Sequence, residues 1–229
     1  MASENGRFAR FLSALVKRER GCVALISNGS ENRKTGNMQQ VTFMRADEEP
    51  HRAVKTGGDR AVCGNCKNRP ENDGPCYVVT CQGPLSAYRA WRRGRYGRGV
   101  KRARKPVRYG AYGDPAAMSA RDFRRLHERL QPAAWTGYTH QWRARRGLRQ
   151  WLMASVDSVA EALLARARGW RWFRIRHAGD PLLPGEIQCP SERSLGKVKC
   201  KDCLLCCGNA RAGAPSVAVV AHGAKAAAF

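Results

Sequence analysis

The sequence lacks any apolar run long enough to cross a membrane, and it is poor in acidic residues. No stretch approaches the roughly 20 consecutive apolar residues that a membrane-spanning helix requires, so no transmembrane segment is expected. Asp and Glu together number 18 against 42 Lys and Arg, which gives a formal net charge of +24. A field of that sign attracts polyanions, so nucleic acid is the first partner to expect and an anionic membrane surface the second.

Two common catalytic motifs are also missing. The chain has neither a Gly-x4-Gly-Lys phosphate-binding loop nor a nucleophile elbow, so nucleotide hydrolysis and esterase chemistry have no motif support. A secretory signal is not expected either, because four basic residues interrupt the apolar residues of the first 20 positions. The pattern of residues 1–20 predicts a basic amphipathic helix. We therefore expect a cytoplasmic protein in a reducing compartment, where thiols stay free or bind metal.

Residues 21–229 have the pattern of a single α/β domain. Apolar, strand-like segments recur along the chain at residues 22–27, 41–44, 107–113, 135–140, 151–155, 170–176 and 216–221. Helical patterns separate several of them, and this alternation favours parallel β/α units. A partial or small β/α barrel is the first fold expected, and an open, mostly parallel sheet is the alternative.

Two helices in the second half have recognisable starts. Ser119 with Asp122, and Ser158 with Glu161, have the spacing of capping boxes. The apolar face of the first helix consists of Phe123, Leu126 and Leu130. The inward face expected for the second consists of Val159, Leu163, Leu164 and Ala167.

Polar residues follow three of the predicted strands. In parallel β/α folds the chemistry gathers at the carboxyl ends of the strands. The candidate catalytic residues there are Asp114, Tyr138, His140 and Asp157. Each has a simpler alternative role: Asp114 precedes a proline and suits a turn, His140 suits a hydrogen-bonded loop, and Asp157 suits a helix N-terminus.

Nine of the ten cysteines lie in two short polar windows. The first is an insert at residues 63–81, too poor in apolar residues to order itself, with the candidate metal ligands Cys63, Cys66, Cys76 and Cys81. The second is a loop at residues 189–208 with the candidate ligands Cys189, Cys200, Cys203 and Cys206, which leaves Cys207 spare. A Cys-x2-Cys pair lets two thiolates reach one ion. Zinc and an iron–sulfur cluster both remain possible, since spacing alone does not separate them.

A basic segment occupies residues 89–108, where ten Lys and Arg occur without an acid. Trp91 and Tyr96 are interleaved with these cations, a pattern typical of nucleic-acid contact. The candidate phosphate-binding side chains are Arg92, Arg93, Arg95, Arg98, Lys101, Arg102 and Arg104. Such contacts are largely independent of sequence and strongly salt-dependent.

Several short motifs occur in a distinctive combination. They are Lys-Thr-Gly at residues 34–36, Cys-Gly-Asn-Cys at 63–66, Tyr-Gly-Asp-Pro at 112–115, Gly-Tyr-Thr-His-Gln-Trp at 137–142 and Met-Ala-Ser-Val-Asp at 153–157. Together with the cysteine-rich tail, this set resembles a family of uncharacterised proteins carried by phages and plasmids. The resemblance implies an origin in a mobile genetic element and no particular chemistry.

A looser likeness is to radical-SAM-type barrels, in which cysteines after the first strand hold a cluster. The standard Cys-x3-Cys-x2-Cys motif of that superfamily is absent, because Cys63, Cys66 and Cys76 are spaced differently.

The sequence as a whole thus predicts a metal-stabilised nucleic-acid-binding protein of a plasmid or phage, acting in replication, maintenance or transfer of the element. The alternative is an iron–sulfur or other metal-dependent enzyme of radical-SAM-like barrel type that acts on a nucleic acid or nucleotide.

Overall fold

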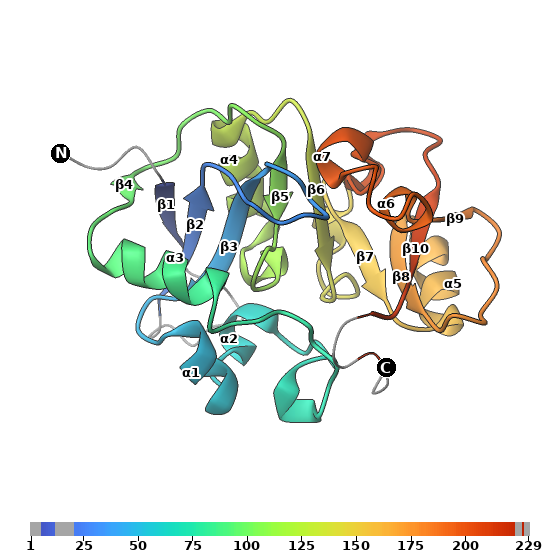
Figure 1. Ribbon diagram of the computed structural model, residues 1–229, viewed down its shortest axis with the longest axis horizontal. Coiled ribbons are helices and arrows are strands. Elements are labelled where there is room, and N and C mark those ends of the chain that lie inside the picture. Colours follow the sequence, from blue (N-terminus) through green and yellow to red (C-terminus); the bar gives the residue numbers. More distant parts are fainter. Residues whose placement is uncertain (1–5, 12–20, 223–225, 227–229) are drawn as a thin grey trace.

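The computed structural model describes residues 6–11, 21–222 and 226. Its centre is a ten-stranded sheet in the order β4-β1-β2-β3-β5-β6-β7-β8-β10-β9 (Figure 1). The strands are β1 (Gly6–Phe11), β2 (Cys22–Ser27), β3 (Gln39–Arg45), β4 (Gly97–Arg98), β5 (Val107–Tyr109), β6 (Trp135–Thr139), β7 (Met153–Val156), β8 (Trp172–Arg176), β9 (Glu186–Gln188) and β10 (Ser216–Val220). From β3 to β9 every neighbouring pair in this order is parallel, whereas β2 pairs antiparallel with both β1 and β3.

The middle of the sheet is the core of the domain. All seven residues of β3 are buried, as are five of the six residues of β2. Strands that are covered on both faces have near-continuous apolar sequences. For this reason residues 22–27 and 41–44 are recognisable as strands in the sequence.

Helices cover both faces of the sheet (Figure 1). Their bounds are α1 (Pro50–Lys55), α2 (Arg60–Cys63), α3 (Gly83–Arg92), α4 (Ala120–Leu130), α5 (Val159–Ala167), α6 (Pro190–Arg193) and α7 (Cys200–Cys203). The crossovers through α4 and α5 advance along the sheet, from β5 to β6 and from β7 to β8. The crossover through α6 and α7 runs back from β9 to the inner strand β10, so right-handed connections place α6 and α7 on the opposite face.

The two predicted capping boxes are present. The Ser119 hydroxyl accepts a hydrogen bond from the Asp122 amide, and the Ser158 hydroxyl accepts one from the Glu161 amide. In α4 the predicted face of Phe123, Leu126 and Leu130 is buried.

The face predicted for α5 is wrong. Ala162 and Ala165 are buried, while Val159 and Leu163 are 47% and 55% exposed. Small side chains on the inner face let the helix lie close to β7 and β8, and this close approach prevails over the burial of larger residues.

Two further expectations need correction. The sheet is open, with β4 and β9 at its edges, so the alternative of an open, mostly parallel sheet describes the fold and the barrel does not. Gly6–Phe11, part of the predicted helix 1–20, is strand β1, paired residue by residue with β2. The unpaired edge of β2 offers backbone hydrogen bonds that override a local helical pattern. The remaining residues of that predicted helix lie outside the described part of the chain.

Within the described residues, no helix combines the length and the apolar character that a membrane crossing demands.

One half-buried histidine, His127, links α4 to the sheet. A hydrogen bond of 2.9 Å joins His127 Nδ1 to the Tyr109 hydroxyl, and the His127 ring lies 4.6 Å from the Trp135 ring. Burial lowers the pKa of His127 to about 4.

The free energy of unfolding should therefore fall between pH 6.5 and pH 4. In that interval the unfolded chain binds a proton at His127 that the folded protein does not bind, so acid favours unfolding. Because the ring is only half-buried, we expect a contribution of about 1–2 kcal/mol. Denaturant unfolding of the wild type and His127→Gln at several pH values measures it. Equal losses in both proteins would contradict the assignment.

Candidate functional site

Three side chains meet at the carboxyl ends of neighbouring parallel strands. Asp114 follows β5, His140 follows β6 and Asp157 follows β7. This is the lower edge of the sheet in Figure 1, where α1 and α2 also lie. The predicted convergence of these three residues is thus present in the structure.

Asp114 orients the other residues. Its Oδ1 accepts a hydrogen bond from the Ala116 amide and its Oδ2 accepts one from the His140 amide, both at 2.8 Å. The preceding Gly113 has φ +71°, and a Cβ there would lie 2.1 Å from the Phe43 carbonyl oxygen, so this turn requires glycine. Burial raises the pKa of the Asp114 carboxyl, and the hydrogen bonds offset only part of that effect. The turn-forming role expected from Asp-Pro is therefore confirmed.

His140 and Asp157 are neighbours at this edge. His140 Nε2 lies 3.8 Å from Asp157 Oδ2 and 3.4 Å from Asn68 Nδ2. Burial alone would lower the pKa of His140, but its hydrogen bond to Cys66 and the nearby negative charges raise that pKa to about 9. The negative charges around His140 thus favour the protonated form of its imidazole.

Asp157 is almost completely buried, with 2% of its side chain exposed. Its Oδ2 accepts a hydrogen bond from Asn68 Nδ2 at 3.3 Å and lies 3.5 Å from Lys67 Nζ. Its Oδ1 is buried and has no hydrogen-bond partner among the described residues. A carboxylate held between a cation and an imidazole can accept and return a proton.

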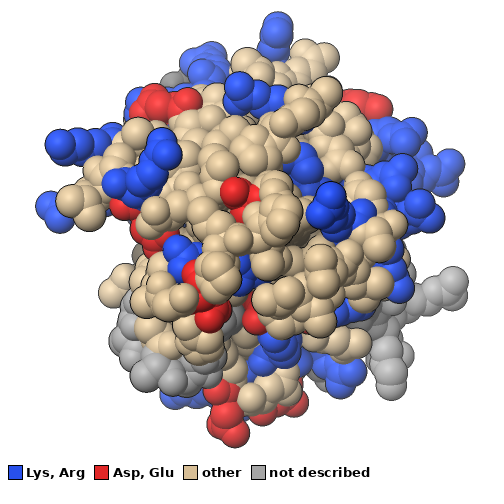
Figure 2. Space-filling model, turned by 90° about the vertical axis from the view of Figure 1, so that its right-hand side faces the viewer, with Lys and Arg blue, Asp and Glu red and all other residues tan. Residues whose placement is uncertain are grey.

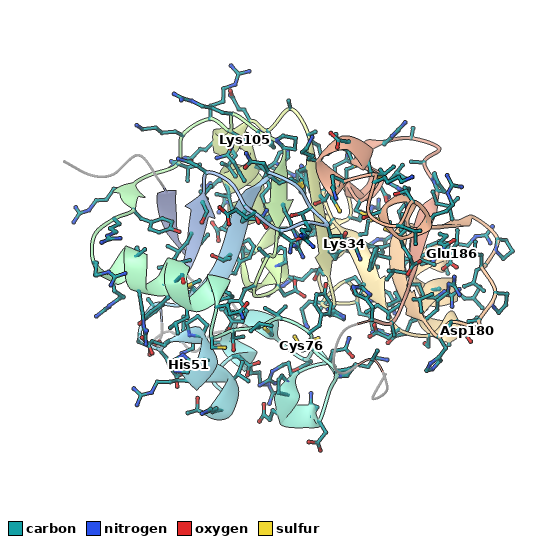
Figure 3. All side chains as sticks on the ribbon, viewed as in Figure 1. Lys34, His51, Cys76, Lys105, Asp180 and Glu186 are labelled. Atoms are coloured by element: carbon teal, nitrogen blue, oxygen red, sulfur yellow. The ribbon has the colours of Figure 1, made fainter. Side chains whose placement is uncertain are left out.

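The Cys-rich insert lies directly beneath this edge. Burial raises the pKa of the Cys63 thiol well above its usual value, and negative charge on Asp59, Cys66 and Cys76 raises it further. Cys66 is bound to His140, and Figure 3 places Cys76 below the strand ends. The structure therefore places Cys66 beside His140 and brings the charges of Cys66 and Cys76 to bear on Cys63, while Cys81 is exposed.

Polar contacts tie the insert to the domain. Arg69 forms a bidentate ion pair with Asp59, with nitrogen–oxygen distances of 3.1 and 2.7 Å. Both side chains are at most 5% exposed. Arg69 also contacts Glu71, and Gln141 donates a hydrogen bond to the Cys63 carbonyl oxygen. The insert was expected to need something other than apolar packing, metal first, to order it; a buried ion pair and side-chain-to-backbone bonds contribute to that order.

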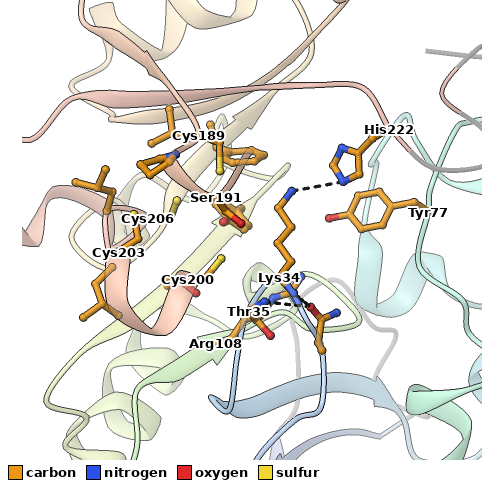
Figure 4. A pocket seen from close by; sticks show the side chains of 18 residues that line it. Lys34, Thr35, Tyr77, Arg108, Cys189, Ser191, Cys200, Cys203, Cys206 and His222 are labelled. Atoms are coloured by element: carbon orange, nitrogen blue, oxygen red, sulfur yellow. Dashed lines mark hydrogen bonds between the residues drawn. The ribbon is translucent and has the colours of Figure 1, made fainter. Parts of the chain in front are cut away.

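A second, separate site occupies one face of the sheet. It is a cavity of about 240 Å³, lined by Cys189, Cys200, Cys203 and Cys206 among other residues (Figure 4). Tyr138 lines this cavity, 4.5 Å from the ring of Phe173. Tyr138 thus belongs with the second cysteine group and not with His140, two residues later, because β6 ends at Thr139 and the side chains no longer alternate regularly beyond it.

The cavity is positively charged. Lys34 and Arg108 line it together with His222, and neither Asp nor Glu does. Lys34 Nζ lies 3.4 Å from His222 Nε2, as Figure 4 shows. For Cys200, burial raises the thiol pKa, whereas the charges of Arg108 and Lys34 act to lower it. Nothing in the sequence distinguishes Lys34 and Arg108 from the other cations, since the charge runs elsewhere are denser.

The candidate ligands are near one another without forming a closed site. Within residues 6–11, 21–222 and 226, no group of three or more His, Cys, Asp or Glu side chains is arranged so that it could hold a metal ion. The pKa of the Cys206 thiol is nevertheless raised first by burial and also by the charges of Cys200, Cys189 and Cys203. The four thiols of the second group therefore face a common space.

Apart from its last residue, Arg108, which lines the cavity, the basic segment lies away from both sites. It leaves α3, passes the edge strand β4 and reaches the upper edge of the sheet, where Figure 3 labels Lys105. All seven candidate phosphate-binding residues between positions 92 and 104 are exposed. Figure 2 shows that Lys and Arg also outnumber acids at the β9 end of the molecule, so positive charge is not confined to this segment.

The aromatic residues of the basic segment contribute to the fold. Trp91 and Tyr96 are partly buried against the core, and the Tyr96 hydroxyl is 2.9 Å from Ser27 Oγ. Their rings are thus less available for base stacking than the sequence pattern indicated.

Comparison with known proteins gives no match: no family model fits the sequence, and neither a curated protein nor a solved structure is similar to it.

Loss of the buried pair in the insert should destabilise the protein. Asp59→Asn leaves the Arg69 guanidinium buried without its main partner, so we expect the free energy of unfolding to fall by about 3–5 kcal/mol. Glu71→Gln is the control: Glu71 contacts the same arginine but is 49% exposed, so its loss should cost less than about 1 kcal/mol. Denaturant unfolding measures both, and similar losses would contradict the role given to Asp59.

Proposed function

We propose that the protein binds nucleic acid through the exposed cations of the basic segment. The observation that carries this proposal is that Arg92, Arg93, Arg95, Arg98, Lys101, Arg102 and Arg104 are all exposed along one stretch without an acid. Arginine and lysine so placed attract phosphates and release bound counterions.

The burial of Trp91 and Tyr96 favours phosphate contacts over base stacking. Binding should therefore depend little on sequence, because phosphate contacts position a protein without reading bases. In a phage or plasmid, the context that the resemblance implies, such binding would serve replication, maintenance or transfer of the element in the cytoplasm. Metal at the two Cys-rich segments would stabilise the structure around it.

Neutralising the basic segment should weaken binding and lower its salt dependence. We expect Arg93→Gln, Arg98→Gln, Lys101→Gln and Arg104→Gln combined to reduce the slope of log K against log salt by about 3–4, close to 0.9 for each lost phosphate contact. Fluorescence anisotropy with labelled single- and double-stranded DNA and RNA measures it.

The control carries the same charge change on α4. Arg121, Arg124, Arg125 and Arg129 are also exposed, and their replacement by Gln should leave most of the slope intact. Equal effects of the two sets would mean that only net charge matters, and a larger effect of the α4 set would move the binding surface to that helix.

A second candidate function is metal-dependent catalysis at the strand ends. It is favoured by His140 and Lys67, which lie within 3.8 and 3.5 Å of the buried carboxylate of Asp157. A positioned acid–base pair contributes roughly 10²–10⁴-fold to a reaction rate.

If the strand-end cluster is catalytic, Asp157→Asn should lower turnover of a nucleic acid or nucleotide by at least about 10²-fold. Product analysis after incubation of metal-loaded protein with DNA, RNA and nucleotides measures it. Asp73→Asn, an exposed change in the Cys-rich insert of residues 63–81, is the control. Turnover by wild type that survives Asp157→Asn would exclude this role.

A further inference from the structure

Four cysteines frame the cavity on the face of the sheet, and each is fixed to a different part of the fold. The Cys189 amide donates to the Ala218 carbonyl oxygen in β10, and the Cys206 carbonyl oxygen accepts from the Gly137 amide in β6. The Cys200 amide donates to the Lys34 carbonyl oxygen, and Cys203 closes the single turn of α7 that Cys200 opens. The frame is therefore rigid although its four thiols come from one loop.

Arg171 and Gly208 hold the far end of that loop. The Arg171 guanidinium donates hydrogen bonds to the carbonyl oxygens of Leu205, Gly208 and Pro215. Gly208 has φ +63°, and a Cβ there would lie 2.5 Å from the Leu152 amide nitrogen, so only glycine fits this approach to the sheet. The position of Cys206 is thus set by contacts that do not involve the thiols.

The four thiols line a common cavity but, within the described residues, do not converge on one point. A zinc ion bound by four thiolates brings every sulfur to about 2.3 Å from a single point. Here the four cysteines line a cavity of about 240 Å³, and no group of three ligands in the described residues converges tightly enough to hold an ion. A cluster of several irons and bridging sulfides fills a cavity of this size, while a single ion does not.

The positive charge of the cavity lining suits an anionic cluster. Lys34 and Arg108 are half-buried, line the cavity and form no ion pair with a carboxylate of the described residues. A cation that is partly removed from water and has no carboxylate partner is stabilised by a bound anion. A cluster held by four thiolates carries net negative charge and supplies that partner.

The rest of the lining is largely apolar. Tyr138, Phe173, Leu204, Leu205 and Val217 face the cavity, and the Tyr138 side chain forms a hydrogen bond with Cys206. Exclusion of water and hydrogen bonds to sulfur are the features by which proteins set the reduction potential of iron–sulfur clusters.

We propose that this cavity holds a [4Fe–4S]-type cluster ligated by Cys189, Cys200, Cys203 and Cys206, with Lys34 and Arg108 as its counter-charges. Cys207 is not a ligand: it does not line the cavity, and its sulfur lies 3.9 Å from Arg171. The inference concerns the metal content of one loop and is independent of nucleic-acid binding, which is measured separately.

The first test is the composition of the full chain, purified without air from cells supplied with iron or reconstituted with iron and sulfide. We expect brown protein with about four irons and four acid-labile sulfides per chain, as for clusters held by four cysteines. Mössbauer spectroscopy identifies the cluster type. Zinc without iron, or iron without sulfide, would overturn the proposal.

Cysteine variants then locate the cluster. Cys200→Ser and Cys203→Ser should each lose most of the iron and sulfide, whereas the neighbouring Cys207→Ser should keep both. Iron that survives Cys200→Ser and disappears in Cys66→Ser would place the cluster in the insert and overturn the proposal. Circular dichroism shows whether each variant is folded, and the wild-type composition does not depend on any of them.

Redox titration tests the roles assigned to the residues around the cluster. Dithionite supplies one electron to the oxidised cluster, and Lys34→Gln, Arg108→Gln and Tyr138→Phe should each make the midpoint potential more negative, because each removes a stabilising charge or hydrogen bond from the reduced state. Lys197→Gln, an exposed change on the same loop, should leave the potential close to that of wild type. Unchanged potentials in all three cavity variants would overturn the assigned counter-charges.

Discussion

Parallel pairing of β5, β6 and β7 is the constraint on which the rest of the molecule depends. Because these strands run the same way, the residue that follows each of them emerges at the same edge of the sheet. Asp114, His140 and Asp157 are brought together by that rule, although 43 residues separate the first from the last in the chain. A one-residue change of register would turn the adjoining side chains to opposite faces and disperse the group.

Polar side-chain contacts stabilise both Cys-rich segments of this protein. In the insert, the Arg69–Asp59 pair and the hydrogen bonds of Asn68 and Gln141 already connect the cysteines to the sheet. In the second loop, Arg171 gathers three carbonyl oxygens and thereby forms the wall of the cavity. Both segments are thus arranged before any ion binds, which lowers the conformational entropy that binding must overcome.

The three candidate functional regions occupy different parts of the fold. The acid–base group lies at the carboxyl ends of the strands, the thiol-lined cavity lies on one face, and the basic segment wraps around the β4 edge (Figures 1 and 3). This separation permits each region to be tested by its own variants and its own measurement.

The sequence alone was sufficient to predict the apolar strands, the serine caps at Ser119 and Ser158 and the turn at Asp114. It also predicted that three polar residues follow the ends of strands. These features depend on neighbours in the chain, and periodicity or capping reveals them. Tertiary contacts alone decided that the sheet stays open, that Gly6–Phe11 becomes a strand and that α5 turns Ala162 and Ala165 inward. They also separated Tyr138 from His140 and Cys81 from Cys63, and placed Lys34 and Arg108 beside the thiols, because distances between residues far apart in sequence are set by packing and not by spacing along the chain.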